Sequence, residues 1–165
     1  MIERLLVAVD GSDHARRAAD LAGDLAARYE AQLVVVHVLV YRRLPDAVRR
    51  MAEIEHLVEP AASPAPSLLR WPQEESAEDA RIIAALGEKI LDETERRARD
   101  KGAREVVRCL LQGEPADAIL EEAARRRVDL MVVGCRGLGE LSALLLGSVS
   151  HKLLQLAPCP VLAVK

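Results

Sequence analysis

Two kinds of hydrophobic pattern alternate along the chain. Five mainly apolar runs are typical of strands buried on both faces, and they span residues 5–9, 33–40, 105–111, 129–133 and 161–164. Between them, apolar residues recur at helical spacing over 15–29, 76–101, 115–124 and 148–156. Such strands alternating with amphipathic helices predict a parallel sheet covered on both faces. With right-handed crossovers, this is a doubly wound, Rossmann-like α/β fold.

Short polar, proline and glycine signals mark the ends of these helices. Ser12 suits the N-cap of the first helix, and Pro115 stands in the first turn of the helix that follows it. Gly102 is expected to end the long helix over residues 76–101. Ser148 is expected to cap the last helix, which Pro158 closes.

Residues 41–75 interrupt the alternation of strand and helix patterns. They hold five of the eight prolines, and residues 60–66 (PAASPAP) cannot sustain a helix or a strand. Helical spacing predicts a short amphipathic helix just before them, with apolar positions at Ala47, Met51, Ile54 and Val58. A connection this long is typical of a lid, a partner contact or a disordered segment, and the sequence leaves all three open. We therefore expect one domain over residues 1–165 with a proline-rich insertion.

The glycine spacing near the C-terminus indicates a ligand-binding loop. The strand at 129–133 runs into Gly134, Gly137 follows, and Gly147 precedes Ser148 and the last helix. Glycine lets a backbone approach a phosphate or ribose closely, and a helix N-terminus presents N–H groups and positive dipole to an anion. These features predict a nucleotide-phosphate cradle, although glycines that merely serve turns are the alternative.

Neither standard nucleotide-binding fingerprint is present. The chain lacks the Gly-Lys-Ser/Thr sequence of a P-loop, and its first strand ends in Asp10-Gly11-Ser12 rather than a G-x-G-x-x-G turn. In a doubly wound sheet, ligands bind at the carboxyl ends of the strands, where the strand order reverses. That rule places the loop after Val9 opposite the loop after Val133.

Composition narrows the classes of function. The 165 residues fit one domain, and only 2% of them are aromatic, which argues against binding to single-stranded nucleic acid. A net charge of −3 argues against binding to duplex DNA. No apolar run approaches the ~20 residues of a membrane span, so no membrane contact is expected. Three cysteines, without C-x-x-C spacing or a signal peptide, predict a reducing, cytoplasmic location.

These motifs resemble the universal stress protein family. The resemblance rests on Gly134-x₂-Gly137-x₉-Gly147-Ser148, on residues 7–12 (VAVDGS) and on residues 158–164 (PCPVLAV). It covers the whole chain apart from residues 41–75, where members vary. The glycine spacing is similar to that of the ATP-binding branch. The resemblance implies a five-stranded parallel sheet in the order 3-2-1-4-5, ATP or a related adenine nucleotide as ligand, and a homodimer.

The resemblance also implies which residues surround the nucleotide. The expected nucleoside contacts are Ala8, Val9, Asp10, the backbone of Val38, Val133 and Gly134. The expected phosphate contacts are Gly137, Gly147, Ser148 and Val149, with Arg136 either reaching a phosphate or remaining exposed. Asp10 suits a ribose hydroxyl or, through water, a Mg²⁺ or Mn²⁺ ion held mainly by the phosphates. Capping the turn into the first helix is an equally good role for this carboxylate.

Three functions remain open at this point. The first is an ATP-binding regulatory protein of the stress response with slow or no hydrolysis, whose protein partner the sequence does not identify. The second is a weak ATPase or another nucleotide-hydrolysing enzyme; Asp10, Arg136 and His151 are its only candidates, and none is assigned a catalytic or metal-binding role. The third is a dimeric interaction module that binds no nucleotide.

Two further expectations concern the strands themselves. The apolar final strand, 161–164, should lie at a sheet edge, where pairing between two copies of the chain would form the homodimer. His37 lies within an apolar run and is expected to be a core residue whose hydrogen bonds are satisfied.

Overall fold

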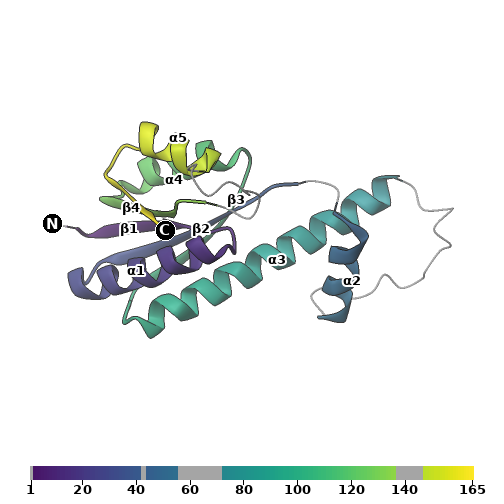
Figure 1. The fold of residues 1–165 in the computed structure, drawn as a ribbon, viewed down its shortest axis with the longest axis horizontal. Helices are drawn as coiled ribbons and strands as arrows, with labels where there is room; N and C mark the ends of the chain where they lie inside the picture. Colours follow the sequence, from purple (N-terminus) through teal and green to yellow (C-terminus); the bar gives the residue numbers. More distant parts are fainter. Residues whose placement is uncertain (1, 42–43, 56–71, 137–146) are drawn as a thin grey trace.

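The structure is a computed structural model that describes residues 2–41, 44–55, 72–136 and 147–165. Within these residues, parallel strands form one five-stranded sheet with helices on both faces (Figure 1). The elements in chain order are β1 (Arg4–Ala8), α1 (Asp13–Tyr29), β2 (Gln32–Leu39), α2 (Asp46–Ile54), α3 (Pro72–Asp100), β3 (Val106–Gln112), α4 (Pro115–Arg126), β4 (Leu130–Gly134), α5 (Ser148–Leu156) and β5 (Val161–Val164). The predicted doubly wound α/β fold is confirmed.

The strand order is β3-β2-β1-β4-β5, which confirms the order that the resemblance implied. The central strand β1 pairs with β2 on one side and β4 on the other, so that Ala8 lies beside Val36 and Val133. Successive strands run outward from β1 to β3 and then resume on the other side at β4. The strand order therefore reverses between β1 and β4, and their carboxyl ends mark the expected ligand edge.

Two hydrophobic clusters lie on opposite faces of the sheet. Val7 and Val35 point into the α1–α3 cluster, which includes Leu91 of α3. Leu6 points the other way, into the α4–α5 cluster, which includes Leu153 of α5. Because successive side chains of a strand alternate between faces, a continuous apolar run supplies both clusters. Figure 1 shows α1 and α3 on one face and α4 and α5 on the other.

α1 and α3 pack with their backbones in close contact at one crossing. A Cβ atom built on Gly23 would lie 2.8 Å from the Cα of Ala98 and 2.9 Å from its carbonyl oxygen. The two small residues therefore allow an approach that larger side chains would prevent. This contact holds α3 against α1 along the α1–α3 cluster.

The predicted insertion contains ordered elements at both of its ends. The short amphipathic helix is confirmed as α2, which ends at Ile54, while Val58 and the prolines at 60–66 lie outside the described residues. The long helix begins at Pro72 rather than at Ser76, because proline fits the first position of a helix. Figure 1 shows α2 packed beside the N-terminal part of α3, beyond the end of the sheet.

A buried ion pair holds α2 against α3. The Asp79 carboxylate accepts hydrogen bonds from Arg49 Nε at 2.7 Å and Arg49 Nη2 at 3.0 Å, and from the Leu44 backbone N–H at 3.1 Å. Leu44, which donates one of these bonds, also belongs to a small apolar cluster with Ala52 of α2 and Ile82 of α3. Three donors on one carboxylate compensate for the removal of its charge from water.

Candidate functional site

The turn after β1 has a defined hydrogen-bonded geometry. The Asp10 Oδ1 atom accepts a hydrogen bond from the Ser12 backbone N–H at 3.0 Å, so this carboxylate shapes the turn. Gly11 between them has φ +83°, a conformation that favours glycine. A Cβ on Gly11 would also lie 3.3 Å from Ile90 of α3. The expected turn-capping role of Asp10 is therefore confirmed.

Ser12 links the two loops that the sequence placed opposite each other. Its Oγ atom accepts a hydrogen bond from the Ala15 N–H at 3.2 Å, which confirms Ser12 as the N-cap of α1. The same hydroxyl donates to the carbonyl oxygen of Arg136 at 3.3 Å. Because Arg136 follows β4, this bond joins the carboxyl ends of β1 and β4 directly.

The N-terminus of α5 is attached to the same end of β4. The Gly147 N–H donates to the Cys135 carbonyl at 2.9 Å, and the buried Ser150 hydroxyl donates to the Gly134 carbonyl at 2.7 Å. These two bonds bring the first turn of α5 to the ligand edge of the sheet. Sequence reasoning missed Ser150, although its position three residues after Gly147 marks the first helical turn.

The expected N-cap of α5 is wrong by one residue. Gly147 is the N-cap, with the extended backbone φ −60°, ψ 149°, and Ser148 is already the first residue of the helix. Without a side chain, Gly147 contributes no capping hydrogen bond to the N–H groups of the first turn. A helix leaves its first N–H groups without intrahelical partners, so this end of α5 can present them to an anion.

Gly134 has a clear packing role in the fold. A Cβ there would lie 2.9 Å from both the Ala15 backbone nitrogen and the His14 carbonyl carbon. This glycine therefore lets the end of β4 approach the first turn of α1. Close packing between strand and helix is one of the three roles that glycines have in dinucleotide-binding turns.

The structure brings together four of the apolar residues expected around the ligand. Side chains from β1, β2, β4 and α5 share the α4–α5 cluster, namely those of Ala8, Val38, Val133 and Val149. The Val9 side chain instead faces the α1–α3 cluster. Arg136 is half-buried rather than exposed, and Cys135 beside it is buried. Gly137 lies outside the described residues.

His37 has the hydrogen-bond partner that the sequence predicted, although the residue is half-buried rather than part of the core. Its Nδ1 atom lies 2.7 Å from the carbonyl oxygen of Val9, and the ring is half-buried on β2. The sequence predicted that His37 forms a hydrogen bond within the protein, but it did not identify the partner. This partner belongs to the last residue before the Asp10 turn.

Lys152, the cationic side chain on α5, already forms ion pairs within the protein. Lys152 Nζ lies 2.6 Å from Asp117 Oδ1 and 3.4 Å from Glu114 Oε2, both on or beside α4. The hydrogen bond with Asp117 raises the pKa of Lys152, so the ammonium stays charged and paired. His151, its neighbour, is exposed. Among the described residues, no group of three or more His, Cys, Asp or Glu side chains is arranged to hold a metal ion.

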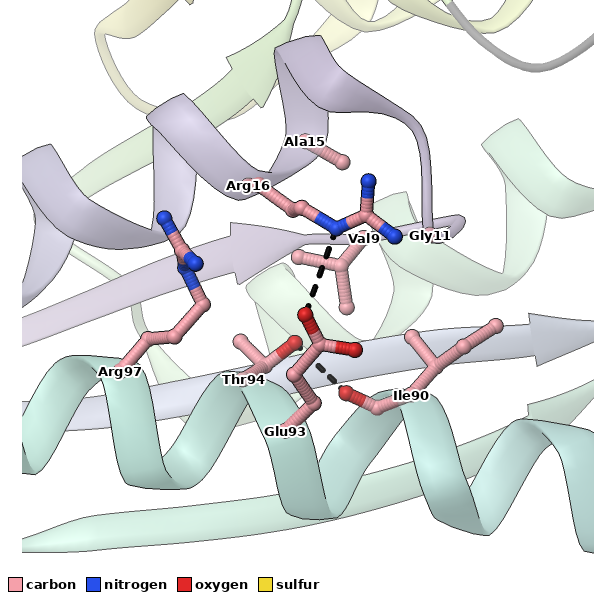
Figure 2. Close-up of a pocket in the computed structure, with 8 residues that line it drawn as sticks. All are labelled: Val9, Gly11, Ala15, Arg16, Ile90, Glu93, Thr94 and Arg97. Carbon is pink, nitrogen blue, oxygen red and sulfur yellow. Dashed lines mark hydrogen bonds and ion pairs between the residues drawn. The ribbon is translucent and has the colours of Figure 1, made fainter.

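Figure 2 shows a small pocket behind the β1 turn, between α1 and α3. Arg16 Nε lies 3.3 Å from Glu93 Oε1 across this pocket, and Arg97 pairs with Asp20 at 2.6 Å. The two arginines that line it are thus paired with protein carboxylates. The pocket lies on the α1–α3 face, whereas the Ser12, Gly147 and Ser150 bonds converge on the edge between β4 and α5. The pocket is therefore separate from the place where the β4 and α5 loops converge.

None of the described helices is long and apolar enough to cross a membrane. None of the three cysteines forms a disulfide. Burial raises the pKa of the Cys109 and Cys159 thiols, which keeps them in the less reactive protonated form.

Comparisons with known proteins agree with this architecture. The model of the universal stress protein family matches residues 1–55 and 51–165. The Thermus aquaticus protein called "Universal stress protein in QAH/OAS sulfhydrylase 3'region" is 39% identical over 165 residues, covering 100% of both chains. The Bacillus subtilis "Universal stress protein YxiE" is 35% identical over 165 residues, with the same coverage. A solved universal stress protein in complex with cAMP is 27% identical with a TM-score of 0.66, covering 99% of this chain and 97% of the other.

Proposed function

Because the chain belongs to the universal stress protein family, we propose that it is a regulatory protein that binds ATP or a related adenine nucleotide. The observation that carries this proposal is the convergence of the β1 turn, the end of β4 and the first turn of α5 at one edge of the sheet. The cAMP complex of the structural relative supports an adenine ligand, since that complex belongs to a protein of the same family.

The chemistry of the converging groups fits a nucleotide. The first turn of α5, at Gly147, Ser148 and Val149, would face the phosphates, where the helix dipole favours negative charge. Ala8, Val38 and Val133 would supply an apolar surface for the nucleoside, and Asp10 would meet the ribose. A bound Mg²⁺ or Mn²⁺ would neutralise phosphate charge and would be held mainly by the phosphates.

We propose that hydrolysis is slow or absent. Rapid phosphoryl transfer needs a charge-neutralising Lys or Arg and positioned carboxylates. Lys152 is paired with Asp117, Asp10 shapes the β1 turn, and His151 is exposed on α5. Because these side chains already have other roles or are exposed, we favour a protein that binds and responds to the nucleotide over a dedicated ATPase.

We also propose a homodimer that forms through β5. This strand pairs with β4 on one side and occupies an edge of the sheet. Leu162 at its centre is 38% exposed, which leaves an apolar side chain on an edge strand. Unpaired edges of this kind invite pairing with another chain. Two copies related by two-fold symmetry would each contribute the same strand.

Calorimetric titration of nucleotide-stripped protein with ATP, ADP, AMP and cAMP tests the proposed function. We expect saturable binding of one molecule of ATP per chain, in the presence of Mg²⁺. An overnight incubation with ATP should give turnover far below the ~1–100 s⁻¹ of kinases. Absence of binding by all four nucleotides would contradict the proposal, and multiple turnovers per second would replace it with an enzyme.

A further inference from the structure

His37 makes an unusual connection between two neighbouring strands. Its Nδ1 atom lies 2.7 Å from the carbonyl oxygen of Val9, just beyond the end of β1. The N–H of the same Val9 donates to the Val36 carbonyl at 2.9 Å. Both backbone polar groups of Val9 are therefore held from β2, one by its backbone and the other by a side chain.

The ring of His37 is itself held in place by α3. A Cβ built on Gly87 would lie 3.1 Å from His37 Cδ2 and 2.7 Å from the neighbouring Leu39 Cδ2. The glycine thus leaves the space that the imidazole and the leucine occupy. A ring fixed between α3 and β1 can act as a rigid support for the Val9 carbonyl.

The Val9 carbonyl is the last backbone group before the proposed nucleotide turn. Asp10 accepts from Ser12 N–H at 3.0 Å, and Ser12 in turn contacts Ala15 and Arg136. A rotation of the Val9–Asp10 peptide would move Asp10 and break this chain of bonds. His37 is thus the side chain that restrains the turn at its first peptide.

The geometry points to His37 as a positioning residue for nucleotide binding: its Nδ1–H group fixes the Val9 carbonyl, and through it the Asp10–Ser12 turn. This inference rests on the proposed function, because the turn matters for binding only if the nucleotide lies against it. A carbonyl oxygen only accepts hydrogen bonds, so Nδ1 must carry a proton. His37 contacts the turn from the α1–α3 face and need not touch the nucleotide.

Three variants of His37 separate a hydrogen-bonding role from packing alone. His37→Asn keeps an amide donor near the position of Nδ1, whereas His37→Gln moves that donor one bond further along the side chain. His37→Leu has no donor and leaves the Val9 carbonyl without its partner. Val35→Ala is the matched control, because Val35 is buried on the same face of β2, two residues earlier.

Two measurements test the inference: ATP affinity by calorimetry, and amide hydrogen exchange over residues 9–16 without nucleotide. We expect His37→Leu and His37→Gln to weaken ATP binding by about tenfold, because the nucleotide would then have to order a turn that the hydrogen bond no longer holds. Exchange at Ser12, Ala15 and Arg16 should be faster in both variants. His37→Asn should stay within about threefold of wild type. Val35→Ala should lower the melting temperature and leave affinity and exchange at the turn unchanged.

Wild-type affinity and exchange in His37→Leu, or equal losses in His37→Asn and His37→Gln, would overturn the inference. The exchange experiment needs no nucleotide and therefore stands apart from the proposed function. If the wild type binds no nucleotide, the proposed function fails, while exchange in the Asn and Gln variants still decides whether His37 holds the turn.

Discussion

Gly147 begins α5 without a capping side chain, although its extended backbone suits serine equally well. We predict that Gly147→Ser stabilises the free protein by a few tenths of a kcal/mol, because the new hydroxyl caps the first turn. The same hydroxyl would occupy an N–H group that the phosphates need, so ATP affinity should fall. Thermal unfolding and calorimetric titration measure the two effects.

Gly147→Val should also weaken ATP binding, by placing a branched side chain where the phosphates would lie. Ala157→Val is a matched control, because Ala157 flanks the other end of α5 in a similar extended conformation, φ −61°, ψ 140°. Unchanged ATP affinity in both Gly147 variants would exclude the N-terminus of α5 from the binding site.

Glu122 is a buried carboxylate on α4 with a strongly lowered pKa. Its side chain is 8% exposed, and hydrogen bonds from Arg125 and Arg126 lower its pKa from 4.5 to about 2. A lowered pKa means that the folded state favours the ionised form. This contribution to stability is complete above the unfolded-state pKa and is lost as the pH falls from about 4.5 towards 2.

We predict that this group contributes up to about 3 kcal/mol to the stability of the folded protein at neutral pH. Glu122→Gln should remove most of that contribution and flatten the dependence of stability on pH between 5 and 2.5. Glu121→Gln is the control, because Glu121 is its exposed neighbour on the same helix. Urea unfolding across this pH range provides the comparison. Equal pH profiles for the wild type and Glu122→Gln would contradict the prediction.

Sequence patterns located candidate residues better than they separated the roles of those residues. Asp10 and Gly134 were expected beside a ligand, and the structure gives each a structural role as well. Asp10 shapes the turn after β1, and Gly134 lets the end of β4 pack closely against α1. The role of Asp10 is local and was one of the two that the sequence predicted, whereas the role of Gly134 depends on α1, which is distant in the sequence. Ser150 and the partner of His37 were missed for the same reason, since their carbonyl acceptors lie in other elements.

At the scale of elements, two helical glycines allow different kinds of close contact. A Cβ on Gly23 would meet backbone atoms of Ala98 at 2.8 and 2.9 Å, whereas one on Gly87 would meet the ends of Leu39 and Leu110 side chains at 2.7 and 2.9 Å. Leucine methyl groups can rotate away, but the backbone of α3 can move only as a whole.

We therefore predict that Gly23→Ala destabilises the protein by about 1–2 kcal/mol, despite the higher helix propensity of alanine. Gly87→Ala should change stability by less than about 1 kcal/mol, because the gain in propensity offsets a milder clash. Chemical denaturation of both variants tests the contrast. Unchanged stability in Gly23→Ala would show that the α1–α3 crossing tolerates a methyl group, and a larger loss in Gly87→Ala than in Gly23→Ala would contradict the contrast.

Most elements were predictable because their apolar patterns are long and regular. The errors concern ends: β1 and β2 begin one residue earlier than expected, β3 and β4 begin one residue later, α3 begins at Pro72, and Gly147 takes the cap expected at Ser148. Ends depend on individual hydrogen bonds, such as the one from Gly147 to Cys135, which no local pattern encodes. The alternation of elements predicted the doubly wound fold, whereas the order of the strands came from the family resemblance.

At the scale of the whole molecule, the exposed edge strand predicts self-association. Leu162→Lys should convert the proposed dimer to a monomer, because a charged side chain on an edge strand opposes pairing. Ile54→Lys is the control, since Ile54 is 77% exposed on α2, away from the sheet. Sedimentation velocity at tens of micromolar measures both. A monomeric wild type would rule out the dimer and leave the nucleotide site untouched.

Backbone amide chemical shifts, recorded while ATP is titrated into isotope-labelled protein, test the proposed nucleotide site most directly. The largest changes should occur at the carboxyl ends of β1 and β4 and in the first turn of α5, including Gly11, Ser12 and Val149. Changes centred on Arg16 and Arg97, which line the pocket between α1 and α3, would place the nucleotide elsewhere. A spectrum unaffected by ATP would contradict nucleotide binding altogether.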